Sequence, residues 1–265
     1  MKRMKANYHT HTWRCKHAVG EERQYVENAI KGGIQILGFS DHTPMPYKGG
    51  YVSPSKMSLD ELEGYVDTVL SLKQEYASDI EIHLGLEVEY YPAYFEDLLR
   101  FCEDYPIEYF LLAQHFLGNE IGEVFSGNVT HEKQSLTRYV DQCIEAMETG
   151  RFTYLAHPDL LNYQGDDAFY QAEMRRLCQG AKRLDVPLEI NFLGIWDHRH
   201  YPHPLFWPLA AEEGNTVIFG SDAHRPDKVY NPEAEKVALS MVEKYHLPLL
   251  TEISFVSPFA ERTSK

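Results

Sequence analysis

The amino-acid sequence predicts an α/β fold in which parallel strands close into a slightly distorted barrel. Short β-branched or apolar runs alternate with amphipathic segments of helical spacing, the pattern typical of βα units. Seven or eight such units follow one another without a Gly/Ser-rich linker or a low-complexity run. Polar side chains gather where these strands should end, as on the active face of parallel barrels. We therefore expect one domain over residues 1–265.

The predicted elements are defined by apolar spacing and by turn residues. The predicted strands are 6–11, 35–40, 80–89, 109–114, 153–156, 187–192 and 216–220, with a weaker eighth run at 249–254. The predicted helices are 21–31, 58–76, 93–103, 132–148, 167–184, 204–213 and 232–245. Ser58, followed three residues later by Glu61, forms a capping-box pattern that supports a helix start at this point.

The composition favours a metal site and argues against nucleic acid as a partner. The chain has 40 acidic and 25 basic residues, so its net charge of -15 excludes a broad electropositive surface. Bound metal ions would supply positive charge locally, and 13 histidines are available. The four cysteines are widely spaced, which indicates neither a disulfide framework nor a thiolate zinc site. No run approaches the roughly 18 apolar residues of a membrane span, so we expect a cytoplasmic protein that does not enter membranes.

Candidate metal ligands stand at the ends of successive predicted strands. His9 and His11 are two residues apart in a strand and so point to the same side, and Asp222 and His224 repeat this spacing. A single buried histidine is more often a hydrogen-bonded core residue than a ligand. A whole set at strand ends is harder to explain in that way, because each buried polar group would need its own partner. The set comprises His9, His11, His17, His42, Glu87, His115, His157, Asp222 and His224.

Several of these residues lie in short motifs that resemble those of one known family. The motifs are His9-Thr10-His11, Lys16-His17-Ala18, Ser40-Asp41-His42, Gly85-Leu86-Glu87, Gln114-His115, Ala156-His157-Pro158-Asp159 and Gly220-Ser221-Asp222-Ala223-His224. Together they resemble the polymerase and histidinol phosphatase (PHP) family, and they extend from residue 9 to residue 224. The chain is similar to the histidinol-phosphatase branch in being a stand-alone domain with helix-forming insertions after residues 42 and 115.

The resemblance implies a distorted (βα)7 TIM-like barrel, the PHP fold, with three divalent metal ions (Zn, Mn or Fe) at its carboxyl face. The first ion would be held by His9, His11, Glu87 and Asp222. Glu87 would bridge to the second ion, since a carboxylate has two oxygens to offer where a neutral imidazole has one lone pair. That second ion would be completed by His115 and His157, and the third would be held by His17, His42 and His224.

The activity implied is hydrolysis of L-histidinol phosphate to L-histidinol and phosphate in histidine biosynthesis. A hydroxide that bridges two metal ions of a trinuclear site would be the nucleophile, with Glu87, Asp222 and Arg199 as the catalytic residues. The sequence has no Gly-x-Ser-x-Gly, Cys-x5-Arg or Walker motif that would support covalent catalysis or nucleotide binding. The alternatives are another PHP-type phosphoesterase (a nuclease, a nucleoside-phosphate phosphatase or a phosphotyrosine phosphatase) and a metal-binding module without turnover, which the complete ligand set disfavours.

Contacts to a small phosphomonoester are predicted from charged residues beside the ligand motifs. Arg199 is the preferred phosphate clamp, because a guanidinium group matches phosphate bidentately. Lys16 and Arg225 are further candidates, although a solvated surface charge explains Lys16 equally well. The possible partners of a cationic substrate tail are Glu89, Asp159 and Asp197. No nucleic-acid or membrane partner is expected, and the oligomeric state is left open.

Overall fold

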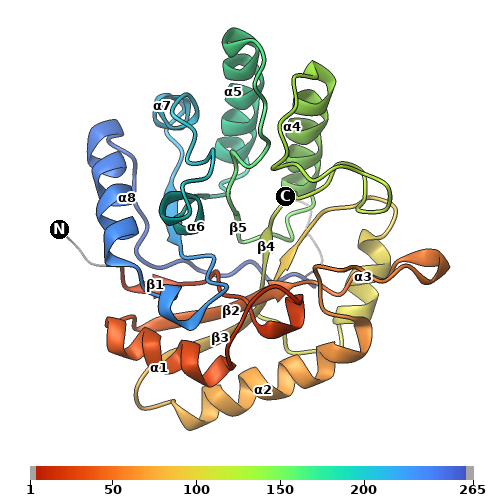
Figure 1. Ribbon diagram of the computed structural model, residues 1–265, viewed down its shortest axis with the longest axis vertical. Helices are drawn as coiled ribbons and strands as arrows, with labels where there is room; N and C mark the ends of the chain where they lie inside the picture. The colour runs from red at the N-terminus through yellow and green to blue at the C-terminus, as the bar shows by residue number, and fades with distance from the viewer. Residues whose placement is uncertain (1–3, 261–265) are drawn as a thin grey trace.

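The computed structural model describes residues 4–260 and contains one sheet of seven parallel strands surrounded by helices (Figure 1). The strands are hydrogen-bonded in chain order, from first to last. They are β1 (Ala6–Asn7), β2 (Ile36–His42), β3 (Glu81–Val88), β4 (Tyr109–Leu112), β5 (Tyr154–Leu155), β6 (Leu188–Asn191) and β7 (Val217–Gly220). All seven main predicted strands are thus present, and several are shorter than expected.

The two edge strands of the sheet meet just beyond their carboxyl ends. Thr10, after β1, forms an isolated parallel bridge with Ala223, after β7. The backbone N–H of His11 donates to the carbonyl of Ala223 over 3.0 Å, and the N–H of Ala223 donates to the carbonyl of His9 over 3.3 Å. The sheet is therefore nearly closed into a barrel, which confirms the predicted distorted (βα)7 architecture. The closure also brings the first and last ligand motifs together.

The helices lie close to their predicted positions. They are α1 (Glu22–Gly32), α2 (Leu62–Glu75), α3 (Phe95–Cys102), α4 (Lys133–Glu148), α5 (Asp167–Arg183), α7 (Phe206–Glu212) and α8 (Pro232–Tyr245). The predicted helix start at Ser58 is a capping box on the 3-10 turn η3 (Leu59–Glu61), which runs directly into α2. None of the helices within residues 4–260 is long and apolar enough to cross a membrane.

Among the α-helices within residues 4–260, the short helix α6 (Phe192–Trp196) directly after β6 was not predicted. Asn191 ends β6 and caps this helix, since its side-chain oxygen accepts the N–H of Gly194 over 3.1 Å. A helix of five residues has too little spacing to be recognised by periodicity. Its place at the carboxyl end of a strand puts it beside the candidate site.

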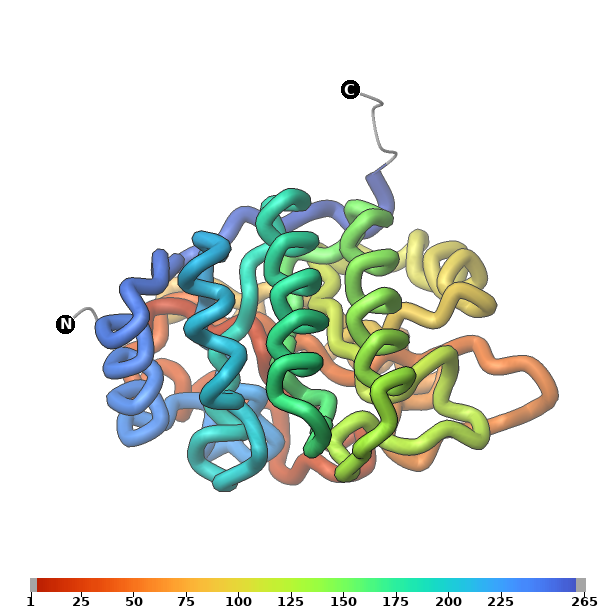
Figure 2. Tube along the Cα trace, turned by 90° about the horizontal axis from the view of Figure 1, so that it is seen from above, coloured from red at the N-terminus to blue at the C-terminus, as the bar shows by residue number. Residues whose placement is uncertain are grey.

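The predicted eighth strand at 249–254 is wrong. Within the described residues this segment makes one isolated bridge to the sheet, between Leu249 and Val217. The chain then crosses the barrel, where Phe255 stacks on Tyr109 at 4.5 Å between ring centroids and meets the ring of Tyr8 edge-on at 5.4 Å. Figure 2 shows this C-terminal segment passing the ends of the helices. The apolar pattern that resembles a strand instead covers the core inside the barrel.

The barrel interior is filled by side chains on the side away from the candidate ligands. Tyr109 is fully buried there, and its hydroxyl donates to the carbonyl of Tyr8 over 2.8 Å. A Cβ atom at Gly85 would lie 2.3 Å from the ring of Tyr109, so only glycine fits at this position of β3. A second, larger core packs the helices against the outside of the sheet. Together these cores hold the strand ends in fixed positions.

Candidate metal centre

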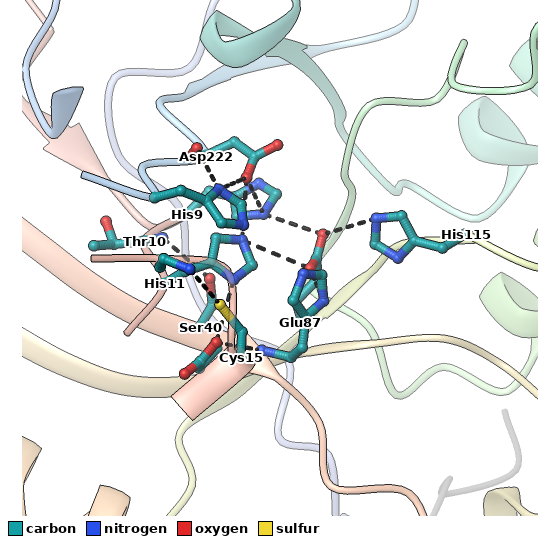
Figure 3. A network of polar contacts seen from close by, with 12 residues as sticks. His9, Thr10, His11, Cys15, Ser40, Glu87, His115 and Asp222 are labelled. Carbon is teal, nitrogen blue, oxygen red and sulfur yellow. Dashed lines mark hydrogen bonds and ion pairs between the residues drawn. The ribbon is translucent and has the colours of Figure 1, made fainter. Parts of the chain in front are cut away.

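The carboxyl ends of the strands bring all the predicted metal ligands into one cluster. Figure 3 shows Glu87 and Asp222 pointing toward the rings of His9 and His11, with His115 on the other side of Glu87. His17 joins the cluster through His224, since the two Nε2 atoms are 3.0 Å apart. Residues separated by more than 200 positions in the sequence are therefore direct neighbours.

Glu87, near the end of β3, is the centre of the cluster. Its Oε1 lies 3.1 Å from Nε2 of His9 and 3.0 Å from Nε2 of His157. Its Oε2 lies 2.7 Å from Nδ1 of His42, and its Oε1 lies 3.9 Å from Nε2 of His115. The two oxygens of one carboxylate thus face different groups of imidazoles, the arrangement that a bridging ligand requires.

Asp222, after β7, forms the second centre of negative charge. Its Oδ1 lies 3.1 Å from Nε2 of His11, 3.3 Å from Nδ1 of His224 and 3.6 Å from Nε2 of His9. Donor atoms within 4.8 Å of one another form overlapping groups, among them His9 with Glu87 and His157, His9 with His11 and Asp222, and His11 with His42 and His224. The overlap is typical of a site that holds more than one ion.

Several buried donor atoms in this cluster have no hydrogen-bond partner among the described residues. Four of them are Nε2 of His9, Nε2 of His11, Nδ1 of His42 and Oε2 of Glu87, and Nδ1 of His157 is a fifth. An unsatisfied buried polar atom ordinarily costs about 1 to 3 kcal/mol. Four such atoms in one cluster have a simple explanation if they are ligand atoms for divalent cations. The residues present therefore fit metal ions.

The charges in the cluster are those that ligands need. Burial alone would raise the pKa of Glu87 and of Asp222, but the surrounding histidines hold the pKa of both carboxyls well below its usual range. Burial lowers the pKa of His42 well below its usual value, so this imidazole is neutral. Burial also opposes the charged form of His9, yet the carboxylates of Glu189, Asp222 and Glu87 raise its pKa well above the usual value.

Two carboxylates outside the predicted set orient the histidines. Glu189 in β6 accepts from Nδ1 of His9 over 2.7 Å and from the backbone N–H of His157 over 3.0 Å. Asp41 in β2 has its Oδ1 3.3 Å from Nδ1 of His11. Such partners fix the ring orientation of a ligand. Sequence reasoning gave them no role, although an acid inside the apolar run Leu188-Glu189-Ile190 is a signal that could have identified Glu189.

Cys15 is a further residue that the sequence did not place at the site. Its sulfur lies within 4.8 Å of donor atoms of both His17 and His224. It accepts a hydrogen bond from the N–H of Ala18 over 3.3 Å, and burial raises the pKa of its thiol well above the usual value. The thiol is therefore protonated next to the cluster.

Two of the predicted metal ligands have an unusual backbone conformation. His157 and Asp222 have φ values of 28° and 47°, in the left-handed region that favours glycine. Such conformations cost about 1 to 3 kcal/mol each and persist where the surrounding structure enforces them, often at functional sites. At the ends of β5 and β7 they turn the side chains toward the cluster.

A pocket of about 610 Å³ opens over the cluster. This is within the usual size of small-molecule sites. Its floor includes His17, His42, His115, His157, Asp222 and His224. Its walls are largely apolar and include Phe116, Phe125, Leu160, Leu193, Trp196 and Tyr201. Such walls offer apolar surface to the non-polar part of a small ligand.

The pocket wall contains two of the three predicted phosphate contacts. Arg199 lines it, and its guanidinium donates to Oδ2 of Asp197 over 2.9 Å and to the hydroxyl of Tyr201 over 3.1 Å. Arg225 also lines the pocket and donates to Oδ1 of Asp227 over 3.0 Å. Lys16 does not reach the wall, because its Nζ donates to the carbonyl of Ser53 over 2.7 Å.

The acids predicted for a cationic tail lie in different surroundings. Asp197 lines the pocket, as does Glu89, which is buried and already paired with Lys56. Asp159 is not part of the pocket wall. It is buried and accepts the indole N–H of Trp207 over 3.2 Å, and burial raises its pKa to about 6. The structure thus gives Asp159 a role in packing and does not bring it to the pocket.

Comparison with known proteins agrees with this geometry. A probable histidinol-phosphatase of Deinococcus radiodurans is 29% identical over 231 residues, which cover 83% of this chain and 86% of the relative. The histidinol-phosphatase of Bacillus subtilis is 33% identical over 119 residues, 43% of this chain and 44% of that protein. The crystal structure of histidinol phosphate phosphatase from Lactococcus lactis, complexed with zinc, L-histidinol and phosphate, superposes with a TM-score of 0.74 at 17% identity and covers 95% of this chain and 99% of its own. The model of the PHP domain matches residues 7–192, well over half of the chain, and the protein therefore belongs to the PHP domain family.

Proposed function

We propose that this protein is a metal-dependent phosphomonoester hydrolase that converts L-histidinol phosphate to L-histidinol and phosphate. The observation that carries the proposal is the cluster of His, Glu and Asp side chains beneath a pocket of small-molecule size, in which several imidazole nitrogens and one oxygen of Glu87 have no hydrogen-bond partner in the described residues. The chain's relatives include proteins named histidinol-phosphatase that it covers over most of their length. Its fold matches that of a phosphatase crystallised with zinc, histidinol and phosphate.

The metal ligands are proposed to divide among three ions. The first would be bound by His9, His11, Glu87 and Asp222, the second by Glu87, His115 and His157, and the third by His17, His42 and His224. Distances of 3.0 to 3.1 Å from Glu87 to His9 and His157 and from Asp222 to His11 support the first two sets. Mixed imidazole and carboxylate ligands suit zinc, manganese and iron.

Bound divalent ions would supply Lewis acidity, which lowers the pKa of water and neutralises charge on the phosphoryl group. The protein's own residues orient the side chains that would bind the ions. Glu189 holds the ring of His9 by a 2.7 Å hydrogen bond, and Glu87 and Asp222 remain ionised among the histidines. These groups are preorganised before substrate arrives, so little reorganisation is needed during the reaction.

Arg199 is proposed to bind the non-bridging oxygens of the phosphate. Hydrogen bonds from its Nε and Nη1 to Asp197 and Tyr201 hold the planar group at the pocket wall. Arg225, on another part of the wall, is the second candidate for this contact. A fixed guanidinium can stabilise the charge that develops on the phosphoryl oxygens in the transition state.

The rest of the substrate would lie against the apolar wall. Phe116, Phe125 and Trp196 offer aromatic faces and edges that suit an imidazole ring. Asp197 carries negative charge at the same wall and is proposed to favour a cationic amine, whereas the charge of Glu89 is already compensated by Lys56. A substrate with an imidazole and an amine therefore fits this pocket better than a neutral aryl phosphate does.

The proposed function is tested by measuring phosphate release from L-histidinol phosphate before and after exhaustive chelation. Activity should disappear on chelation and return when zinc, manganese or iron is added, with metal content followed by elemental analysis. Full activity in protein verified to be free of metal would overturn the metal requirement. Hydrolysis of nucleotides or phosphotyrosine without hydrolysis of L-histidinol phosphate would overturn the substrate assignment.

A further inference from the structure

A fully buried lysine stands at the edge of the pocket, on the segment between β2 and α2. Lys56 has a side-chain exposure of 1%, and its ammonium group forms an ion pair with Glu89, whose side-chain exposure is also 1%. Its Nζ lies 3.7 Å from Oε2 of a second buried acid, Glu120. Lysine is almost never fully buried unless it is paired, because removal of its charge from water is costly. We therefore expect this buried ion pair to have a structural or functional role.

The inner end of the ion pair leads to a metal-ligand candidate. Oε1 of Glu89 accepts from Lys56 and also lies 3.0 Å from Nδ1 of His115. Since a carboxylate can only accept, His115 donates through Nδ1, and its Nε2 keeps a free lone pair. That Nε2 faces Glu87, whose Oε1 is 3.9 Å away. Glu89 thus selects both the tautomer and the direction of the ring of His115.

The other end of the ion pair leads to Glu120, which joins two loop segments of the fold. Glu120 lies on the segment between β4 and α4 and accepts the hydroxyls of Tyr47, Tyr51 and Ser53 over 2.8, 3.2 and 2.7 Å. Three donors from the other segment, in addition to the nearby Lys56, hold this carboxylate in place. Glu120 therefore joins the segment between β2 and α2 to the segment between β4 and α4. The ion pair of Lys56 with Glu89 connects this junction to His115.

We infer that Lys56 and Glu120 are positioning residues that act through Glu89 to hold His115 in its metal-binding tautomer and orientation. Occupancy of the ion that His115 would bind then depends on the contacts of Glu120 between the β2–α2 and β4–α4 segments. The inference rests on the proposed function, which makes His115 a ligand. It adds two residues, Lys56 and Glu120, that would contact no proposed ion. The role of the buried lysine would be to hold Glu89 against His115.

The decisive variant is Lys56→Met, which keeps an unbranched side chain that is one heavy atom shorter and removes its charge. Loss of a partner that orients a ligand typically weakens metal binding about 10- to 100-fold. After dialysis of the zinc-loaded protein against graded chelator, Lys56→Met should lose the same equivalent of zinc that His115→Ala loses. The double variant should lose no more than His115→Ala alone, because both changes act on one position. Lys56→Arg, which keeps the cation, should restore zinc retention.

The chain offers a matched control at another place in the fold. Nζ of Lys73 lies 2.7 Å from Oε1 of Glu108, whose Oε2 lies 2.6 Å from Nδ1 of His83. This is the same order of lysine, carboxylate and histidine, and none of the three residues lines the pocket. Lys73→Met should therefore retain zinc as the unchanged protein does. An equal loss of zinc in Lys73→Met and Lys56→Met would overturn the inference, since a general loss of stability would explain both.

A second readout follows the ring directly. In nitrogen-edited NMR spectra of the zinc-loaded protein, the signal of a proton on Nδ1 of His115 should be present in Lys56→Arg and weakened or lost in Lys56→Met. Glu120→Gln, which keeps a hydrogen-bonding side chain, provides a milder variant and should weaken zinc retention in the same direction. Full zinc retention in Lys56→Met, with loss in His115→Ala, would overturn the positioning role alone. Full retention in His115→Ala would overturn the ligand assignment and this inference together.

Discussion

Replacement of Arg199 by alanine should separate substrate binding from metal binding. The guanidinium lies at the pocket wall, fixed by Asp197 and Tyr201, and no hydrogen bond or ion pair within residues 4–260 joins it to a proposed metal ligand. Its removal should leave metal content unchanged. Because two of its nitrogens are already held by protein acceptors, the group is preorganised to bind a phosphate oxygen. Removal of one preorganised donor of this kind costs about 2 to 4 kcal/mol in the transition state.

That free energy corresponds to a loss of roughly 30- to 1,000-fold in kcat/KM. The assay is phosphate release from L-histidinol phosphate at substrate concentrations below KM, with zinc measured in the same samples. Arg176→Ala is the matched control, because Arg176 is similarly exposed, at 45% against 38%, and is also paired with carboxylates, but lies outside the pocket on α5. Unchanged kcat/KM in Arg199→Ala, or an equal loss in the control, would refute the assignment of Arg199 to the phosphate.

Three further substitutions test the roles of Glu87, Gly220 and Glu108. Glu87→Gln should lower both zinc content and kcat/KM, since an amide cannot bridge two cations as a carboxylate can; full metal and full activity would remove Glu87 as the bridge. Gly220→Ala should lower the melting temperature and zinc retention, because its Cβ would lie 1.7 Å from Oε1 of Glu189, and unchanged values would show that this contact is not tight. Partial burial opposes ionisation of Glu108, but hydrogen bonds, chiefly from His83, lower its pKa from 4.5 to about 2. In urea unfolding, Glu108→Gln should therefore lower stability above pH 4.5, by less than the full pKa shift would give because the group is partly exposed, and the difference should shrink as the pH falls toward 2; a difference independent of pH would contradict this.

The parts of the fold that the sequence predicted well are those with long or repeated local signals. Amphipathic helices such as α5 and α8 were placed within one or two residues, because their apolar spacing extends over several turns. The segment 249–254 was misassigned since its apolar side chains serve another purpose. Ile253 and Phe255 pack against the core inside the barrel, and a short apolar run looks the same in either setting.

The candidate site likewise contains residues that the sequence predicted and residues that it did not. The predicted ligands could be recognised because their motifs are local, for example His9 and His11 two residues apart at a strand end. The residues that orient them could not, because each acts through a partner distant in sequence. Glu189 contacts His9 across 180 positions, and Lys56 meets Glu89 across a separation of 33. Only the closure of the sheet brings such partners together.

Among the charged residues near the motifs, sequence proximity was a poor guide to position. Lys16 and Asp159 belong to ligand motifs, yet the carbonyl of Ser53 holds the first outside the pocket, and Trp207 holds the second in the packed interior. Arg199, outside any ligand motif, lines the pocket. The direction of a side chain after a strand end depends on the following loop, which carries no periodic signal.

The central claim is that the pocket over the metal cluster is built for L-histidinol phosphate. The most direct measurement is the ratio of kcat/KM for L-histidinol phosphate to kcat/KM for p-nitrophenyl phosphate, with one preparation of metal-loaded protein. Both substrates present the same phosphoryl group to the cluster, so the ratio reports contacts to the remainder of the molecule. If the aromatic wall binds an imidazole and the acidic side chain of Asp197 binds an amine, as proposed, the ratio should be several orders of magnitude. A ratio near one would contradict the assignment and indicate a phosphatase that does not discriminate between these substrates.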